Sequence, residues 1–230
     1  MAIRRYLAMT DGEFSNPIPD GWNAGWMACH FSPYGSGLTN LPKMLPTGSL
    51  LILNDRIPPS HCDIRKIFTV LEQIIHLQGC TALLLDFQRR DCPQLQEIAD
   101  KLITLPCPVA VSLPYAKKLT CPVFLPPVPL LTPVNDYLSS WAGREIWLEV
   151  ALTSEQITVD RTGSRAEIVE YASHPLPFRD DSLLCHYQIS VQSTCGVFRL
   201  QRTRQDLADL INRAKQLGVT TAVGLWQELK

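Results

Sequence analysis

The sequence predicts an α/β protein built as a TIM-like (β/α) barrel. Short, almost continuous apolar runs alternate with amphipathic helical patterns along most of the 230 residues, which is typical of parallel strands buried on both faces. Seven or eight such runs, in a chain close to the roughly 250 residues of (β/α)₈ proteins, favour a closed barrel over an open sheet. We expect one domain over residues 1–230, with one strand–helix unit missing or shortened.

The strands are predicted from apolar runs bounded by turn residues. Residues 1–24 are polar and turn-rich, so the first strand is expected only after them. The predicted strands are 25–31, 49–54, 81–87, 108–113, 121–125, 145–151 and 219–226.

The helices between these strands carry start and stop signals. Ser60 and Gly79 bracket a periodic run that predicts a helix over 61–78, and Pro93 suits the first position of a helix over 93–104. Thr203 with Asp206 opens a further helix over 204–217, which Gly218 closes. A weaker helical pattern covers 134–142.

The alternation breaks between about 152 and 202, where we expect a small α+β insertion before the last helix–strand unit. A short strand is predicted at 156–159 and a helix near 164–172. A hairpin of 183–191 with 196–201 then turns at 193–196. The basic cluster Arg202, Arg204, Arg213 and Lys215 is interpreted as a solvated helix face.

Composition excludes several functional classes. The net charge of -1 supplies no electrostatic reason to expect nucleic acid or an anionic membrane as a partner. No signal peptide or membrane-spanning run is visible, so we expect a cytoplasmic protein. Eight cysteines contain no CxxC spacing and are expected to be buried, reduced thiols rather than metal ligands. GxGxxG, GxxxxGK[ST], HExxH and GxSxG are absent, so no cofactor or metal is predicted.

The candidate site lies at the carboxyl ends of the strands, where barrel enzymes hold their chemistry. In TALLLDFQRR (81–90), Leu84, Asp86 and Gln88 share one face because side chains alternate along a strand. Each candidate also has an ordinary structural interpretation, as a cap, a rim group or core packing. The other candidates are His30, Asp55, Tyr115, Glu149 and Trp226, the last expected to lie as a floor above Ala222 and Gly224.

The order of these motifs resembles the family 18 glycoside hydrolases, especially their compact bacterial branch of spore-germination and cortex-associated proteins. TALLLDFQ stands where that family has DGxDxDxE, and PVAVSLP (108–114) follows as the next barrel strand. WAGREIWLEV (141–150) is similar to the end of a short helix and the strand that follows it in that family. The region 152–202 falls where the family has its α+β insertion, and Trp226 matches the family's substrate-floor tryptophan.

The motif itself departs from that family. The family's final Glu, which protonates the leaving oxygen, is Gln88 here; the preceding Asp, which positions the substrate acetamide, is retained as Asp86, and the middle Asp is Leu84. A primary amide cannot supply a proton near neutral pH, and general acid catalysis contributes roughly 10²–10⁴ in rate. The resemblance therefore implies a binding site that has lost its catalytic acid.

Three hypotheses follow. The first is a catalytically impaired, glycoside-hydrolase-like protein that binds a saccharide or a protein partner through Asp86, Gln88, Trp226, Tyr115 and His30. The second is an active glycosidase that uses other rim carboxylates, with Asp55, Asp86 and Glu149 as candidates. The third is a non-catalytic scaffold or assembly protein.

Overall fold

The computed structural model describes residues 2–77, 79–116, 119–172 and 174–230. The chain forms two compact units. The first comprises Met1–Pro126, Arg144–Glu149 and Val219–Lys230, and the second comprises Pro127–Gly143 and Val150–Gly218.

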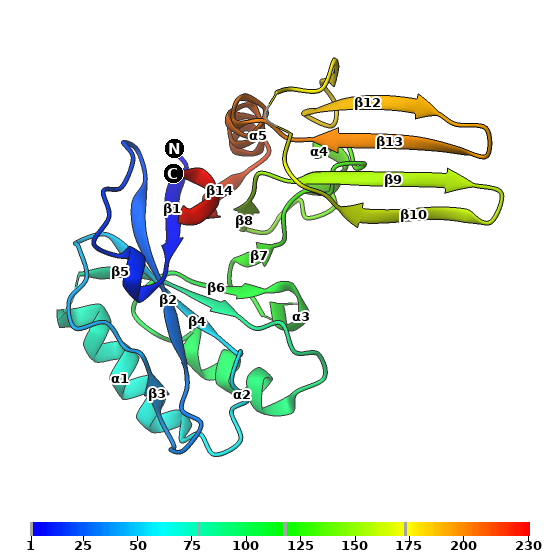
Figure 1. Cartoon of the computed structure of the whole chain (residues 1–230). Coiled ribbons are helices and arrows are strands. Elements are labelled where there is room, and N and C mark those ends of the chain that lie inside the picture. Colours follow the sequence, from blue (N-terminus) through cyan, green and yellow to red (C-terminus); the bar gives the residue numbers. More distant parts are fainter. Residues whose placement is uncertain (1, 78, 117–118, 173) are drawn as a thin grey trace. The chain divides into compact units, whose positions relative to one another are not determined.

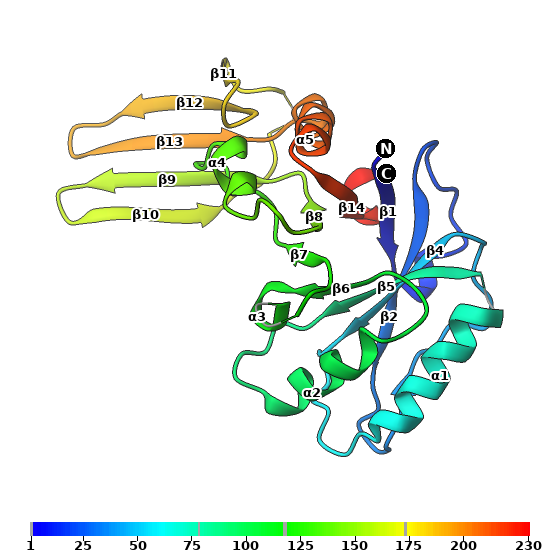
Figure 2. The same ribbon diagram turned by 180° about the vertical axis from the view of Figure 1, so that it is seen from behind.

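The first unit is a parallel β-barrel (Figures 1 and 2). Within the described residues its eight strands follow the order β1-β14-β8-β7-β6-β5-β4-β2, and β1 closes the barrel by pairing with both β14 and β2. The barrel strands are β1 (Arg4–Met9), β2 (Asn23–Phe31), β4 (Ser49–Asn54), β5 (Cys80–Asp86), β6 (Val109–Ser112), β7 (Val123–Leu125), β8 (Ile146–Val150) and β14 (Val219–Leu225). The TIM-like barrel predicted from the sequence is confirmed.

The strand that sequence reasoning missed is β1. Its six residues begin with Arg4 and Arg5 and so resemble a polar tail, yet Tyr6 and Ala8 belong to the barrel core. The barrel thus lacks no strand. The connections, not the strands, are the shortened part of the barrel. Only the 3₁₀ turn η1 (Asp11–Glu13) follows β1, and β3 (Leu38–Thr39), which pairs antiparallel with β2, stands where a helix would follow β2.

Helices after β4 and β5 follow the predicted pattern. α1 (Ile64–Leu77) packs on β5 and on α2 (Pro93–Leu102), and α2 begins at the proline that suits a first helical position. Shorter helices follow β6 and β14, namely α3 (Leu113–Ala116) and α6 (Trp226–Leu229). Among the helices in the described ranges, none combines the length and the apolar character needed to cross a bilayer.

The barrel interior is filled by side chains that alternate inward along the strands. They include two aromatic groups, Tyr6 and Trp147, both almost fully buried. The interior cluster consists of Tyr6, Ala8, Leu50, Ile52, Ala82, Leu84, Ala110, Phe124, Trp147 and Val223, with Met27 and Leu225 packed against it. This packing ends below the last inward residues of β4 and β5, which leaves the carboxyl end of the barrel open to a cavity.

The second unit combines a five-stranded antiparallel sheet, in the order β10-β9-β13-β12-β11, with two helices. The strands are β9 (Ser154–Asp160), β10 (Gly163–Ile168), β11 (Phe178–Asp180), β12 (Cys185–Val191) and β13 (Cys195–Gln201), and the helices are α4 (Val134–Ser139) and α5 (Arg204–Gln216). The predicted hairpin is confirmed as β12 with β13, which turns at 192–194.

Two sequence interpretations in this unit are wrong. The helix expected near 164–172 is the strand β10, because pairing with β9 overrides the helical composition of Arg165, Ala166 and Glu167. Arg202 does not lie on a solvated helix face. Its side chain is 1% exposed, and its guanidinium donates to the carbonyl oxygens of Val128, Leu183 and Leu184 at 3.0–3.2 Å.

Candidate functional site

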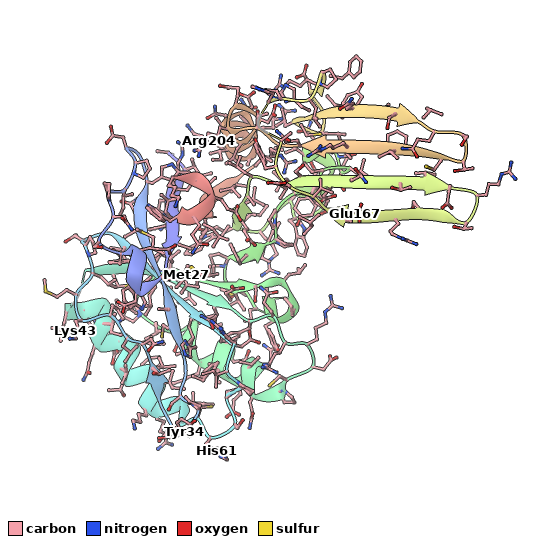
Figure 3. All side chains as sticks on the ribbon, viewed as in Figure 1. Met27, Tyr34, Lys43, His61, Glu167 and Arg204 are labelled. Atoms are coloured by element: carbon pink, nitrogen blue, oxygen red, sulfur yellow. The ribbon has the colours of Figure 1, made fainter. Side chains whose placement is uncertain are left out.

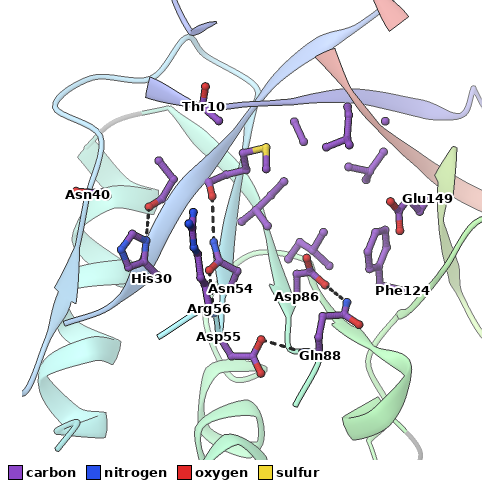
Figure 4. Close-up of a pocket in the computed structure, with 18 residues that line it drawn as sticks. Thr10, His30, Asn40, Asn54, Asp55, Arg56, Asp86, Gln88, Phe124 and Glu149 are labelled. Carbon is purple, nitrogen blue, oxygen red and sulfur yellow. Dashed lines mark hydrogen bonds between the residues drawn. The ribbon is translucent and has the colours of Figure 1, made fainter. Parts of the chain in front are cut away.

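A cavity of about 470 Å³ lies at the carboxyl ends of the barrel strands (Figure 4). Its volume falls in the range of small-molecule sites, roughly 300–1,000 Å³. Its lining combines apolar side chains with polar and charged ones. The lining residues are Ala8, Thr10, Met27, Ala28, His30, Asn40, Ile52, Asn54, Asp55, Arg56, Leu84, Asp86, Gln88, Phe124, Glu149, Val223, Gly224 and Leu225.

Three polar residues stand at the same level of neighbouring strands. His30 of β2 is in register with Asn54 of β4, and Asn54 is in register with Asp86 of β5. In-register residues of parallel strands point to the same face, so this row of imidazole, amide and carboxyl crosses one wall of the cavity. Sequence reasoning identified His30 and Asp86 separately but missed Asn54, whose signal was its place as the last residue of an apolar run.

Asn54 and His30 are positioned by an irregularity in β2. The pairing of β2 with β4 shifts between Trp26 and Cys29, and the Asn54 side-chain amide donates to the carbonyl oxygens of Met27 and Cys29 at 3.1 and 3.0 Å. His30 Nδ1 lies 2.8 Å from the carbonyl oxygen of Ala28. Such a bulge re-aims the side chains that follow it, which turns His30 toward the cavity.

Asp86 and Gln88 lie together along the cavity, as the alternation in TALLLDFQRR predicts. The side-chain amide of Gln88 donates to Asp86 Oδ1. Burial raises the pKa of Asp86, the hydrogen bond from Gln88 opposes that effect, and the nearby carboxyl of Asp55 adds to it. Leu84 lies beneath them in the barrel core.

Asp55 lines the cavity, but its carboxylate is engaged by backbone. Its two oxygens accept from the amide N–H groups of Gln88 at 3.0 Å and Arg89 at 2.8 Å, and the residue is 4% exposed. Arg89 Nε also donates to the Asp55 carbonyl oxygen at 3.1 Å. This carboxylate therefore anchors the segment after β5, which corresponds to the capping interpretation rather than the catalytic one.

Glu149, the inward residue near the end of β8, faces the cavity across from β5 (Figure 4). Burial raises the pKa of its carboxyl to about 7, and the carboxyls of Asp86 and Glu228 add to the effect. Near neutral pH this side chain is therefore divided between its protonated and ionised forms. Asp86 and Glu149 form a like-charged pair in one cavity, an arrangement common at functional sites.

Two predicted ligand-binding residues lie outside the cavity lining. Tyr115 is buried in α3, where its hydroxyl donates to the carbonyl oxygen of Arg89 at 2.6 Å and its ring meets Phe87 edge-on. Trp226 begins α6, and the ammonium of Lys230 lies 4.7 Å from its ring centroid. It is not among the residues that line the cavity, to which β14 contributes Val223, Gly224 and Leu225.

Phe124 of β7 is the aromatic side chain that the cavity uses, and sequence reasoning missed it. It stands between the acidic groups Asp86 and Glu149 in Figure 4. Arg56, Asn40 and Thr10 were missed as well, since they lie in loops after β4, β3 and β1 that no motif marks. In the described part of the chain, no group of three or more His, Cys, Asp or Glu side chains is arranged to hold a metal ion.

No family model matches the sequence, and no curated protein matches it. Solved structures do match. The chitinase-like agglutinin RobpsCRA from Robinia pseudoacacia superposes with a TM-score of 0.63 at 10% identity, covering 95% of this chain and 93% of the agglutinin. The spore cortex-lytic enzyme SleL of Bacillus cereus gives 0.60 at 10% identity, over 96% of this chain and 70% of SleL.

A chitinase from Chromobacterium violaceum matches with a TM-score of 0.58 at 8% identity, over 99% of this chain and 95% of the chitinase. At these identities the likeness is one of fold. The chain thus has the TIM-barrel fold of chitinases and of a cortex-lytic enzyme, as the resemblance to family 18 glycoside hydrolases predicts.

Proposed function

We propose that this protein binds a saccharide in the barrel-mouth cavity without hydrolysing it. The observation that carries the proposal is Gln88. It occupies the position of the catalytic acid in the family motif, and its amide is hydrogen-bonded to Asp86. An amide cannot protonate a leaving oxygen, but it can donate to and accept from sugar hydroxyls.

The composition of the cavity supports a sugar ligand. Its base supplies apolar contact through Phe124 and Met27, and its rim presents amide, imidazole and carboxyl groups from His30, Asn54 and Asp86. Sugars offer both apolar faces and hydroxyl groups, so a site of this mixed character matches them. The fold is also shared with a protein described as a chitinase-like agglutinin, which is consistent with binding.

Calorimetric titration with amino-sugar oligomers tests the proposal, because the family resemblance points to that class. We expect the parent to bind and to release no reducing ends on prolonged incubation. Gln88→Ala removes one ligand-facing amide and should weaken binding at least about tenfold, the effect of a single lost hydrogen bond. Gln188→Ala, which removes an exposed amide from β12, is the matched control and should bind like the parent.

Failure of the parent to bind any oligomer would reject a saccharide ligand of this class. Release of reducing ends by the parent would instead reject the non-hydrolytic part of the proposal.

Hydrolysis through other carboxyls is the second candidate function, and Glu149 is the observation that favours it. A carboxyl whose pKa is raised to about 7 is suited to general acid catalysis, and Asp86 faces the same cavity. If this candidate is correct, the parent hydrolyses amino-sugar oligomers and Glu149→Gln abolishes that activity while binding persists. We propose Asp86 as its partner in preference to Asp55, because both carboxylate oxygens of Asp55 accept from backbone N–H groups.

A further inference from the structure

The five-stranded sheet of the second unit has two faces of different character. Because in-register residues of paired strands share a face, the ladder places Ala166, Ile157, Phe198 and Ile189 in one row across β10, β9, β13 and β12. The neighbouring rows add Val159 with Val191 on one side and Leu200, Tyr187 and Phe178 on the other.

We call this side the apolar face and define its open part by six side chains. They are between 36% and 90% exposed, although each is a large hydrophobic group that proteins usually bury. The six are Val159, Ile168, Phe178, Ile189, Val191 and Phe198.

One end of the apolar face is covered within the unit. Ile157, Cys185 and Leu200 are buried there with Leu130, which comes from the segment before α4. Farther along the strands, the described residues supply no such cover, and the side chains remain open to solvent. Along this part of its length the sheet packs against no second layer of described residues, although an apolar sheet face is normally buried against one.

The opposite side, which we call the polar face, carries side chains that hydrogen-bond within the unit. Arg199 donates to the carbonyl oxygen of Glu170 at 2.7 Å, and the side-chain amide of Gln201 donates to the carbonyl oxygen of Ala172 at 3.2 Å. Glu167, labelled on β10 in Figure 3, accepts from Gln156 at 3.1 Å. Side chains of the polar face thus hydrogen-bond within the unit, whereas large side chains of the apolar face are exposed to solvent.

The exposed area is the size that an interface needs. At roughly 150–250 Å² for a large apolar residue, the six exposed fractions sum to about 700 Å² across the face, against about 300–600 Å² for the largest contiguous apolar patch of an ordinary monomer. A specific interface buries about 800 Å² on each partner. The apolar face therefore matches one side of a stable interface rather than scattered surface hydrophobes.

Charge indicates what kind of partner fits. Among the strand residues that the structure describes, the apolar face carries two charged side chains: Glu155, which is paired with Ile168, and Asp180, which lies two residues from Phe178 on β11. The two rows nearest the turn between β12 and β13, which hold Val159 with Val191 and Phe198 with Ile189, carry no charged strand residue, so an uncharged apolar surface is the partner that fits them. This same face on another copy meets that requirement, and soluble assemblies are most often symmetric pairs of identical patches.

We propose that the apolar face is a homodimer interface in which the sheets of two copies pack face to face. Antiparallel sheets pack in this way at a spacing of about 10 Å and an angle of about 30°, with the inner side chains interdigitated. A two-fold axis through the Phe198 and Ile189 row brings each copy's row onto its partner's. The dimer is independent of what the barrel mouth binds.

Sedimentation and light scattering of the full chain at micromolar concentrations test the proposal. The parent should have twice the 25.8 kDa mass of one chain. Ile189→Glu places a carboxylate at the centre of the apolar face and should raise the dissociation constant at least about 30-fold, the effect of a central interface residue. Val191→Glu, at an even more exposed position, should act in the same direction without disturbing the fold.

Ser190→Glu is the matched control, since Ser190 lies between these two residues but belongs to the polar face. It adds the same charge to the same strand and should leave the dimer intact. A monomeric parent, an unaffected dimer in both apolar-face variants, or dissociation by Ser190→Glu would each overturn the proposal.

Discussion

Replacement of Asp55 by alanine should destabilise the barrel strongly, because its carboxylate organises the segment that carries Gln88. The variant removes two hydrogen bonds, from the amide N–H groups of Gln88 at 3.0 Å and Arg89 at 2.8 Å. A hydrogen bond to a charged group contributes about 1.5–3 kcal/mol, and loss of the acceptor leaves donors unsatisfied at a residue that is 4% exposed. We expect a loss of about 3–5 kcal/mol in the free energy of unfolding, or on the order of 10 °C in melting temperature.

Asp63 provides a matched comparison. One of its oxygens also accepts two backbone N–H groups, from Arg65 at 2.9 Å and Lys66 at 3.2 Å, but this aspartate is exposed at the start of α1. Its replacement by alanine removes a helix cap and should cost about 0.5–2 kcal/mol, since water replaces the lost acceptor.

Urea unfolding of the parent, Asp55→Ala and Asp63→Ala under the same conditions measures the difference. If Asp55→Ala loses no more stability than Asp63→Ala, burial does not strengthen these hydrogen bonds, and the structural assignment of Asp55 is incorrect. Asp55→Asn retains one acceptor oxygen and should fall between the parent and Asp55→Ala.

Two further predictions concern Glu149 and Arg202. The pKa of Glu149 is raised from 4.5 to about 7, so the folded state binds its proton more tightly and this group's contribution to stability is lost as pH rises through that interval. Near pH 8, Glu149→Gln should therefore have a higher unfolding free energy than the parent, by at most about 3 kcal/mol, and this difference should disappear toward pH 4.5. An equal difference at both pH values would contradict the raised pKa of Glu149. Arg202→Lys cannot reproduce three guanidinium hydrogen bonds to buried carbonyl oxygens and should cost the second unit about 1–3 kcal/mol, measured as faster amide hydrogen exchange in β12 and β13. Unchanged exchange rates there would show that Arg202 contributes no stability.

Local pattern was enough to place most of the barrel elements. The apolar run 49–54 coincides with β4, and the helix signals around Pro93 and Thr203 coincide with α2 and α5. β1 was missed since its six residues are recognisable only once β14 and β2 pair with them on either side. Propensity also failed for β10, where composition favoured a helix but the ladder with β9 makes a strand.

For the candidate site too, the sequence predicted some features and only the structure revealed others. The sequence by itself determined that Asp86 and Gln88 share a face, because alternation along one strand is a local property. Only the tertiary structure decided that Glu149 faces Asp86 across the cavity, that Asn54 joins His30 and Asp86 in one row, and that Trp226 lies outside the lining. These placements depend on the register between strands and on a bulge in β2, which arise from packing of segments far apart in the chain.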